Sequence, residues 1–135
     1  MPATLSYDRA QNIVFMSFDR PEELADRTSI AAHFTRVCNF WRENAGGKKS
    51  YFVVDLENIT IDAAMLEHYV QETRRAHELC ALISVRYGGN PLQRTVTRLA
   101  GMKIHRPSNI YETKAEALEV VRKLRVGELQ PESDG

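Results

Sequence analysis

The spacing of apolar residues predicts that the chain alternates between strands and helices. Residues 4–8 (TLSYD) and 12–18 (NIVFMSF) have the length and composition of strands, and the short link containing Asn12 favours a hairpin between them. From Ser29 onward, apolar residues recur at helical spacing, which predicts a helix with one face turned inward. These apolar residues are Ile30, Phe34, Val37, Cys38 and Trp41.

Both ends of this first helix carry sequence signals. Asp26 or Thr28 is placed to cap its start. Gly46 and Gly47 can adopt the positive φ that ends a helix. Residues 51–56 (YFVVDL) then form a continuous apolar run, which is typical of a parallel strand covered by helices on both faces.

The middle of the chain repeats the alternation of helix and strand. A second helix is predicted after Asp62, and residues 81–88 (ALISVRYG) form the next strand. Asn90 is a good N-cap, and Pro91 fits the first position of a third helix. The apolar face of this third helix consists of Leu92, Val96, Leu99 and Met102.

The chain ends with a short strand and a fourth helix. Residues 106–109 (RPSN) are typical of a turn, and residues 110–111 (IY) begin a strand. Thr113 and Glu116 form a capping box at the start of the last helix. Its apolar residues are Ala117, Leu118, Val121 and Leu124. Residues 126–135 are polar and predict a flexible C-terminal tail.

This order of elements predicts an α/β fold. The 135 residues suit one compact domain with one core, which we expect over residues 1–125. Within it we expect a mostly parallel or mixed sheet of four or five strands, packed with about four helices.

The composition of the chain argues against several classes of function. Eighteen basic residues balance eighteen acidic ones, so bulk salt-driven nucleic-acid binding is not expected. No run approaches the roughly 20 apolar residues that cross a bilayer, and the N-terminus does not resemble a signal peptide, so we expect a cytoplasmic protein. Cys38 and Cys80 are expected to be reduced and to pack as small hydrophobes.

The sequence offers little reactive chemistry. The histidines lack metal-ligand spacing, and no cofactor motif is present, so neither a metal nor a cofactor is expected. Asp55, Glu57 and Asp62 lie near a strand end but have no companion that would define acid and base roles. Catalysis is therefore not predicted, although a site assembled across the fold stays open.

A basic segment is the one candidate binding feature. No acidic residue occurs between Glu78 and Glu112. Within this segment, the residues that could hold an anionic ligand or acidic partner are Arg86, Gly88, Gly89, Asn90, Arg94 and Arg98. A glycine turn at a helix N-terminus offers backbone N–H groups to anions, and arginines clamp phosphate or carboxylate. The alternative is a tight turn followed by a solvated helix face.

Residues 50–124 resemble the STAS domain, the fold of bacterial anti-sigma factor antagonists. In that family an apolar strand ends in Asp-Leu, and an Asp-Ser-Ser-Gly-Leu loop then opens a helix. Here Asp55-Leu56 match the strand end, and Asp62 and Leu66 match the loop. Further matches are Leu99-Ala100-Gly101 and Glu116-Ala117-Leu118. The resemblance implies a non-catalytic regulatory or scaffolding module that binds a protein partner.

The Asp62 loop differs from the family pattern at the positions that regulate the family's members. The family's serine is phosphorylated by a partner kinase, but Ala63 and Ala64 stand at the two serine positions and Met65 at the glycine. Alanine has no oxygen that could accept a phosphoryl group. The resemblance therefore implies a STAS-like module without the phosphoswitch, whose partner is a regulatory kinase, a sigma-factor regulator or a second copy in a homodimer. Asp62 has a structural role open to it, as a helix cap.

Overall fold

The protein was analysed as a computed structural model that describes residues 4–18, 24, 26–59, 61–103 and 109–127. Its strands form one mixed five-stranded sheet in the order β1-β2-β3-β4-β5. β1 (Thr4–Asp8) runs antiparallel to β2 (Ile13–Ser17). β3 (Ser50–Asp55), β4 (Ala81–Tyr87) and β5 (Ile110–Tyr111) follow in parallel with β2. The predicted α/β class and the hairpin are confirmed.

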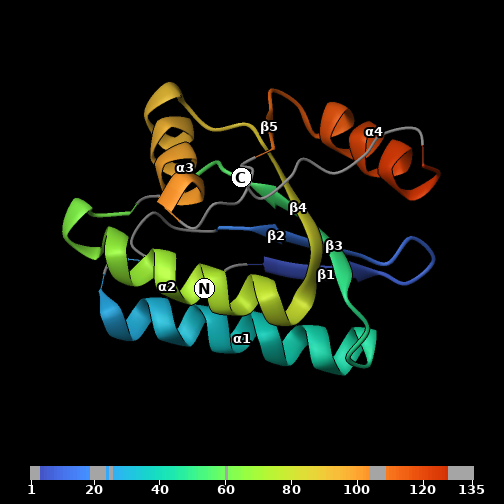
Figure 1. Cartoon of the computed structure of the whole chain (residues 1–135), viewed down its shortest axis with the longest axis horizontal. Coiled ribbons are helices and arrows are strands. Elements are labelled where there is room, and N and C mark those ends of the chain that lie inside the picture. Colours follow the sequence, from blue (N-terminus) through green and yellow to red (C-terminus); the bar gives the residue numbers. More distant parts are fainter. Residues whose placement is uncertain (1–3, 19–23, 25, 60, 104–108, 128–135) are drawn as a thin grey trace.

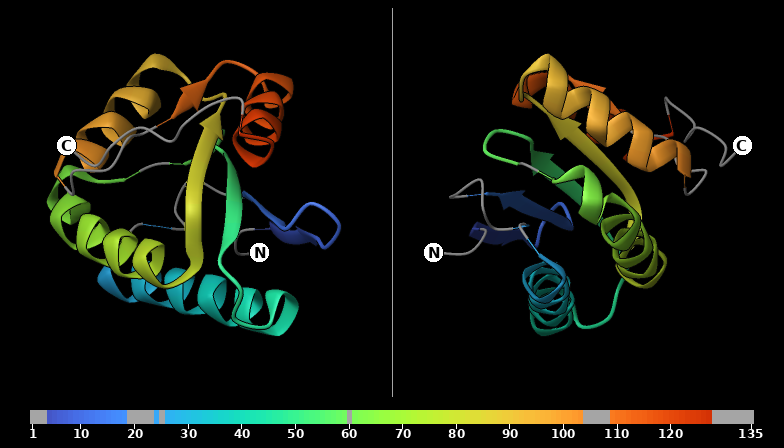
Figure 2. Two further views of the ribbon diagram at one scale, coloured as in Figure 1. Left: turned by 45° about the vertical axis from the view of Figure 1, so that its right-hand side comes forward. Right: turned by 90° about the vertical axis from the view of Figure 1, so that its left-hand side faces the viewer.

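Four helices cover this sheet. They are α1 (Arg27–Ala45), α2 (Leu66–Cys80), α3 (Pro91–Lys103) and α4 (Lys114–Arg125). α1 and α2 lie side by side on one face, and α3 lies beyond α2 toward β5 (Figure 1). α4 packs against β3, β4 and β5 from the opposite face, as the rotated views in Figure 2 also show.

Alternation along the strands divides the core into two layers. Phe52 and Val54 of β3 face α1 and α2. Val53 and Val85 face α4, where they pack with Val121. β3 is therefore covered on both sides, which explains the continuous apolar run in its sequence.

The helix caps follow the sequence signals. Asp26 accepts a hydrogen bond from the Ser29 backbone N–H at 2.7 Å, and Gly46 ends α1 with a φ of 63°. Thr113 Oγ1 accepts one from the Glu116 N–H at 3.2 Å. Each such cap contributes about 1 kcal/mol to helix stability.

The apolar face of α3 does not pack on the sheet. Leu92 is 72% exposed, Leu99 46% and Met102 70%. Among the α3 residues whose side chains the structure describes, the buried one is Thr97, which lies on the opposite side and donates to the Gln93 carbonyl at 2.9 Å. Amphipathic spacing identified the helix, but it did not identify the side that faces the protein.

Two expectations fall largely outside the described residues. Of the predicted turn at residues 106–109, the structure describes only Asn109. Of the predicted tail at residues 126–135, it describes only Val126 and Gly127, directly after the end of α4.

His33 is a polar residue within the α1 layer. It is 5% exposed, and its ring lies 5.1 Å from that of Phe18 and 4.9 Å from that of Phe34. Burial, assisted by the positive charge of Arg36, lowers the pKa of His33 to about 4. The folded protein therefore holds this imidazole neutral at pH values where an exposed histidine binds a proton.

This burial predicts a loss of stability in mild acid. The His33 contribution is complete above pH 6.5 and declines as the pH falls toward 4, because only the unfolded state binds the proton in that window. Between pH 7.5 and 5 we expect the unfolding free energy to fall by about 2 kcal/mol on account of His33. Urea titrations of the wild type and His33→Gln measure the difference. Equal losses in both proteins would contradict the assignment.

Candidate functional site

The loops that follow β3 and β4 meet at one end of the sheet. The two strands are parallel, so their carboxyl ends share an edge. The Leu56 N–H donates to the Tyr87 carbonyl at 2.9 Å, and Gln93 Nε2 donates to the Ile59 carbonyl at 2.9 Å. The Asp62 and Gly88-Gly89 loops thus lie at the same end of the sheet.

The Gly88-Gly89 turn is formed by two left-handed residues, with φ of 74° and 76°. A Cβ on Gly89 would lie 2.9 Å from the Cβ of Leu56. Asn90 and Gln93 form a reciprocal capping box, with Gln93 N to Asn90 Oδ1 at 2.8 Å and Asn90 N to Gln93 Oε1 at 2.7 Å. The predicted N-cap is confirmed. These donors are satisfied by the protein itself, which leaves fewer N–H groups for an anion.

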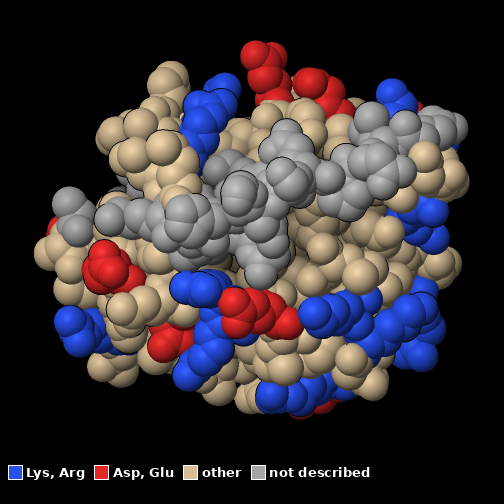
Figure 3. All heavy atoms as spheres, viewed as in Figure 1, with Lys and Arg blue, Asp and Glu red and all other residues tan. Residues whose placement is uncertain are grey.

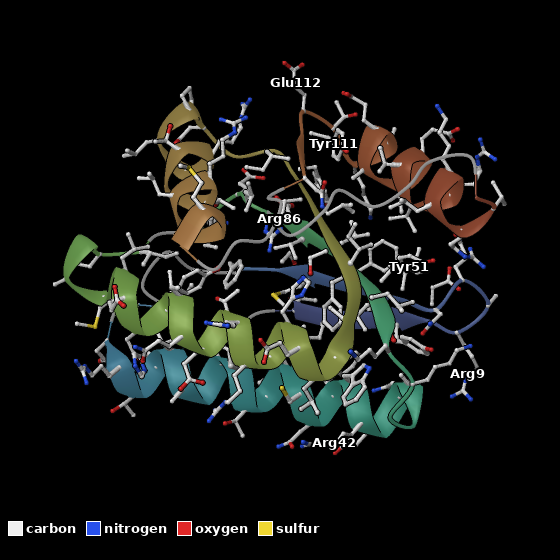
Figure 4. The ribbon with its side chains drawn as sticks, viewed as in Figure 1. Arg9, Arg42, Tyr51, Arg86, Tyr111 and Glu112 are labelled. Carbon is white, nitrogen blue, oxygen red and sulfur yellow. The ribbon has the colours of Figure 1, made fainter. Side chains whose placement is uncertain are left out.

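A groove of about 620 Å³ opens beside this turn. Its charged lining consists of Asp55, Glu57, Glu112 and Lys114. Three carboxylates against one ammonium disfavour an anionic ligand here. Figure 3 shows acidic side chains at the top of this face, where Figure 4 labels Glu112 in the same view. Basic side chains gather at the lower right, where Figure 4 labels Arg9 and Arg42.

Tyr87 lies at the base of the groove. Burial and the neighbouring Asp55 carboxylate raise the pKa of Tyr87. Asp55 also accepts a hydrogen bond from the Glu57 N–H at 2.8 Å. The Asp55 side chain is therefore the shared neighbour of Tyr87 and of the Glu57 backbone N–H at this strand end.

The structure places the three predicted arginines in different surroundings. Arg86 is half-buried and lines a partly open cavity between the sheet and the helices, and Figure 4 shows it near the centre of the molecule. Arg94 Nη2 donates to the Gly89 carbonyl at 3.0 Å and so braces the turn. Arg98 lies exposed on α3. Strand alternation turns Arg86 to the same face of β4 as Ser84, so it does not line the groove beside the Gly88-Gly89 turn, and anion binding by the three arginines stays a prediction.

The cavity around Arg86 was not predicted. Its volume is about 60 Å³, enough for a small number of waters. Apolar side chains make up most of its lining, and its polar lining residues are His33, Tyr69, Thr73, His77, Ser84 and Arg86. Burial lowers the pKa of Arg86. Two polar residues at inward-facing positions of an apolar strand, Ser84 and Arg86, were the available sequence signal.

The Asp62 loop is a capped turn. Asp62 Oδ1 accepts from the Ala64 N–H at 2.9 Å, and its carbonyl accepts from the Met65 N–H at 2.8 Å. These bonds hold a 3₁₀ turn over Ala63–Met65, and α2 begins at Leu66 without a side-chain cap of its own. Asp62 therefore caps the turn that leads into α2. Ala64 is exposed, and Met65 packs against the core.

Comparison of the chain with family models, curated proteins and solved structures finds no match. Across the described part of the chain, no three His, Cys, Asp or Glu side chains are grouped to hold a metal ion. The helices within those same residues are not both long and apolar enough to cross a membrane.

The close approach of Gly89 to Leu56 predicts unequal costs for two neighbouring substitutions. Both Gly88→Ala and Gly89→Ala place a side chain at positive φ, at a cost of about 1–2 kcal/mol. In Gly89→Ala the free energy of unfolding should fall by a further 1–3 kcal/mol, approximately, because the added Cβ overlaps Leu56. The nearest neighbour of a Cβ on Gly88 is Asp55 Oδ1 at 3.6 Å, an ordinary contact. Urea unfolding of both variants tests this, and equal losses would refute the steric account.

Proposed function

We propose that the chain is a non-catalytic, STAS-like regulatory or scaffolding module of the cytoplasm that binds a protein partner. The partner surface consists of the exposed apolar face of α3 and the Asp62 loop. The candidate partners are a regulatory kinase, a sigma-factor regulator and a second copy of this chain.

The observation that carries the proposal is the exposure of α3. Leu92, Leu99 and Met102 lie within an arc of about 80° around the helix axis. All three are substantially exposed, at 72%, 46% and 70%. Single exposed apolar residues are ordinary, but several on one helix face mark an interaction surface. Helix faces of this kind dock into a partner's groove or against another helix.

Two further observations support a protein partner. α3 contacts α2, and Gln93 of α3 is hydrogen-bonded to the loop that precedes Asp62, so helix face and loop form one region. The element order, with an antiparallel β1 and four parallel strands in chain order, agrees with the STAS resemblance. The acidic groove beside the Gly88-Gly89 turn gives no support to the alternative of a small anionic ligand there.

Charge on the α3 face should weaken partner binding. We expect Leu92→Glu with Met102→Glu to weaken a complex isolated with the wild type at least tenfold, because each apolar side chain contributes about 1.5 kcal/mol or more when buried. The dissociation constant is measured with the purified partner, and self-association by analytical ultracentrifugation. Leu82→Glu is the matched control. Leu82 is 53% exposed and lies at the start of β4, whereas α3 follows the other end of that strand. If the double variant binds as the wild type does, α3 is not the interface.

The Asp62 loop should not accept phosphate. Ala63 and Ala64 have no hydroxyl group, so intact mass spectrometry with peptide mapping, after incubation with ATP and cell extract, should detect no phosphate in residues 60–66. Ala64→Ser is the informative comparison, because this residue is exposed and follows the capping Asp62. Stoichiometric phosphate mapped to this loop in the wild type would show that the STAS correspondence is out of register.

A further inference from the structure

The chain's two cysteines meet across the contact between α1 and α2. Cys80 Sγ donates to Cys38 Sγ at 3.6 Å, although the residues are 42 positions apart. Cys38 lies within α1, and Cys80 is the last residue of α2. An S–S bond is about 2.05 Å long, so the sulfurs need to approach by roughly 1.5 Å to form one.

The two thiols differ in access. Cys38 is half-buried and lines an outer groove of about 280 Å³ between α1 and α2. Cys80 is 1% exposed and lines the cavity around Arg86 on the other side. A reagent that enters the outer groove reaches Cys38 first, with Cys80 directly behind it.

The groove favours a negative charge on Cys38. Its charged lining residues are Arg42, Glu72 and Arg75, and Arg75 is paired with Glu72 at 2.8 Å. The hydrogen bond from Cys80, followed by the charges of Arg42 and Arg75, lowers the pKa of Cys38 to about 7 against opposition from burial and Glu72. The same bond, together with burial, raises the pKa of Cys80. Cys38 is thus the sulfur of the pair that ionises first, and Cys80 holds the proton.

We propose that Cys38 and Cys80 form a peroxide-sensitive dithiol, in which Cys38 is attacked first and Cys80 resolves it to an intramolecular disulfide. The inference is independent of the proposed partner. It replaces the expectation that both cysteines serve only as small hydrophobes.

The oxidant in the proposed reaction is a hydroperoxide, and it accepts the two electrons that the thiol pair loses. The Cys38 thiolate attacks one peroxide oxygen, the O–O bond breaks, and the other oxygen leaves with a proton as water or alcohol. Cys38 becomes a sulfenic acid. The Cys80 sulfur then attacks the Cys38 sulfur, an S–S bond replaces the S–O bond, and the hydroxyl leaves with the Cys80 proton as water. Two thiols are oxidised by two electrons, and one peroxide is reduced.

The first test uses the full chain without substitution. After brief exposure to dilute hydrogen peroxide, intact mass should fall by two hydrogens, free thiols should fall from two to none, and dithiothreitol should reverse both changes. Peptide mapping should join Cys38 to Cys80 within one chain. A gain of oxygen with Cys80 still titratable, a disulfide-linked dimer, or no reaction at doses that oxidise free cysteine would each overturn the proposal.

Two variants separate the roles of the sulfurs. In Cys80→Ala, Cys38 should stop at the sulfenic acid, which a cyclic 1,3-diketone traps. The pH midpoint of Cys38 alkylation should also be higher in this variant than in the wild type, because the hydrogen bond from Cys80 is lost. In Cys38→Ala, the remaining thiol should react at least tenfold more slowly than the wild type. Reaction of Cys38→Ala at the wild-type rate would assign the attack to Cys80 and overturn the order. Circular dichroism checks that each variant is folded.

Discussion

Burial of the parallel strands β3 and β4 from both sides is the constraint on which the rest of the structure depends. Strands covered on both faces have no solvent-facing side, so almost every residue along them has to be apolar. Phe52 and Val54 meet that requirement toward α1 and α2, and Val53 and Val85 meet it toward α4. Packing against these residues fixes where the helices lie. Because β2 to β5 are parallel, it also brings the loops that follow β3 and β4 to one edge.

The same constraint makes the polar exceptions informative. Ser84 and Arg86 occupy inward-facing positions on β4, where an apolar side chain would pack more favourably. Together with His33 of α1 they surround a small cavity in the main core. Desolvating an imidazole and a guanidinium in one place is costly, and burial lowers the pKa of both groups. Hydrophobic collapse therefore accounts for the framework but not for these residues.

Local rules predicted the fold well and the candidate site less well. Hydrophobic periodicity located the elements, and caps such as Asp26 and Thr113 depend only on residues three positions away. Arg86 was grouped with the Gly88-Gly89 turn because the two are close in sequence, whereas strand alternation turns Arg86 to the face of β4 that carries Ser84. The outward face of α3 and the meeting of the two cysteines depend on how helices pack. No local pattern encodes that packing.

The contact between α1 and α2 separates two hollows in the protein. Phe34 of α1 and Ala76 of α2 line both the cavity around Arg86 and the outer groove, so they form the partition between these two spaces. Cys38 lies on the groove side of that partition, and Cys80 lies on the cavity side. Closely packed interiors transmit small displacements to their neighbours. A change in the spacing of α1 and α2 therefore alters the groove, the thiol pair and the cavity that contains Arg86 at the same time.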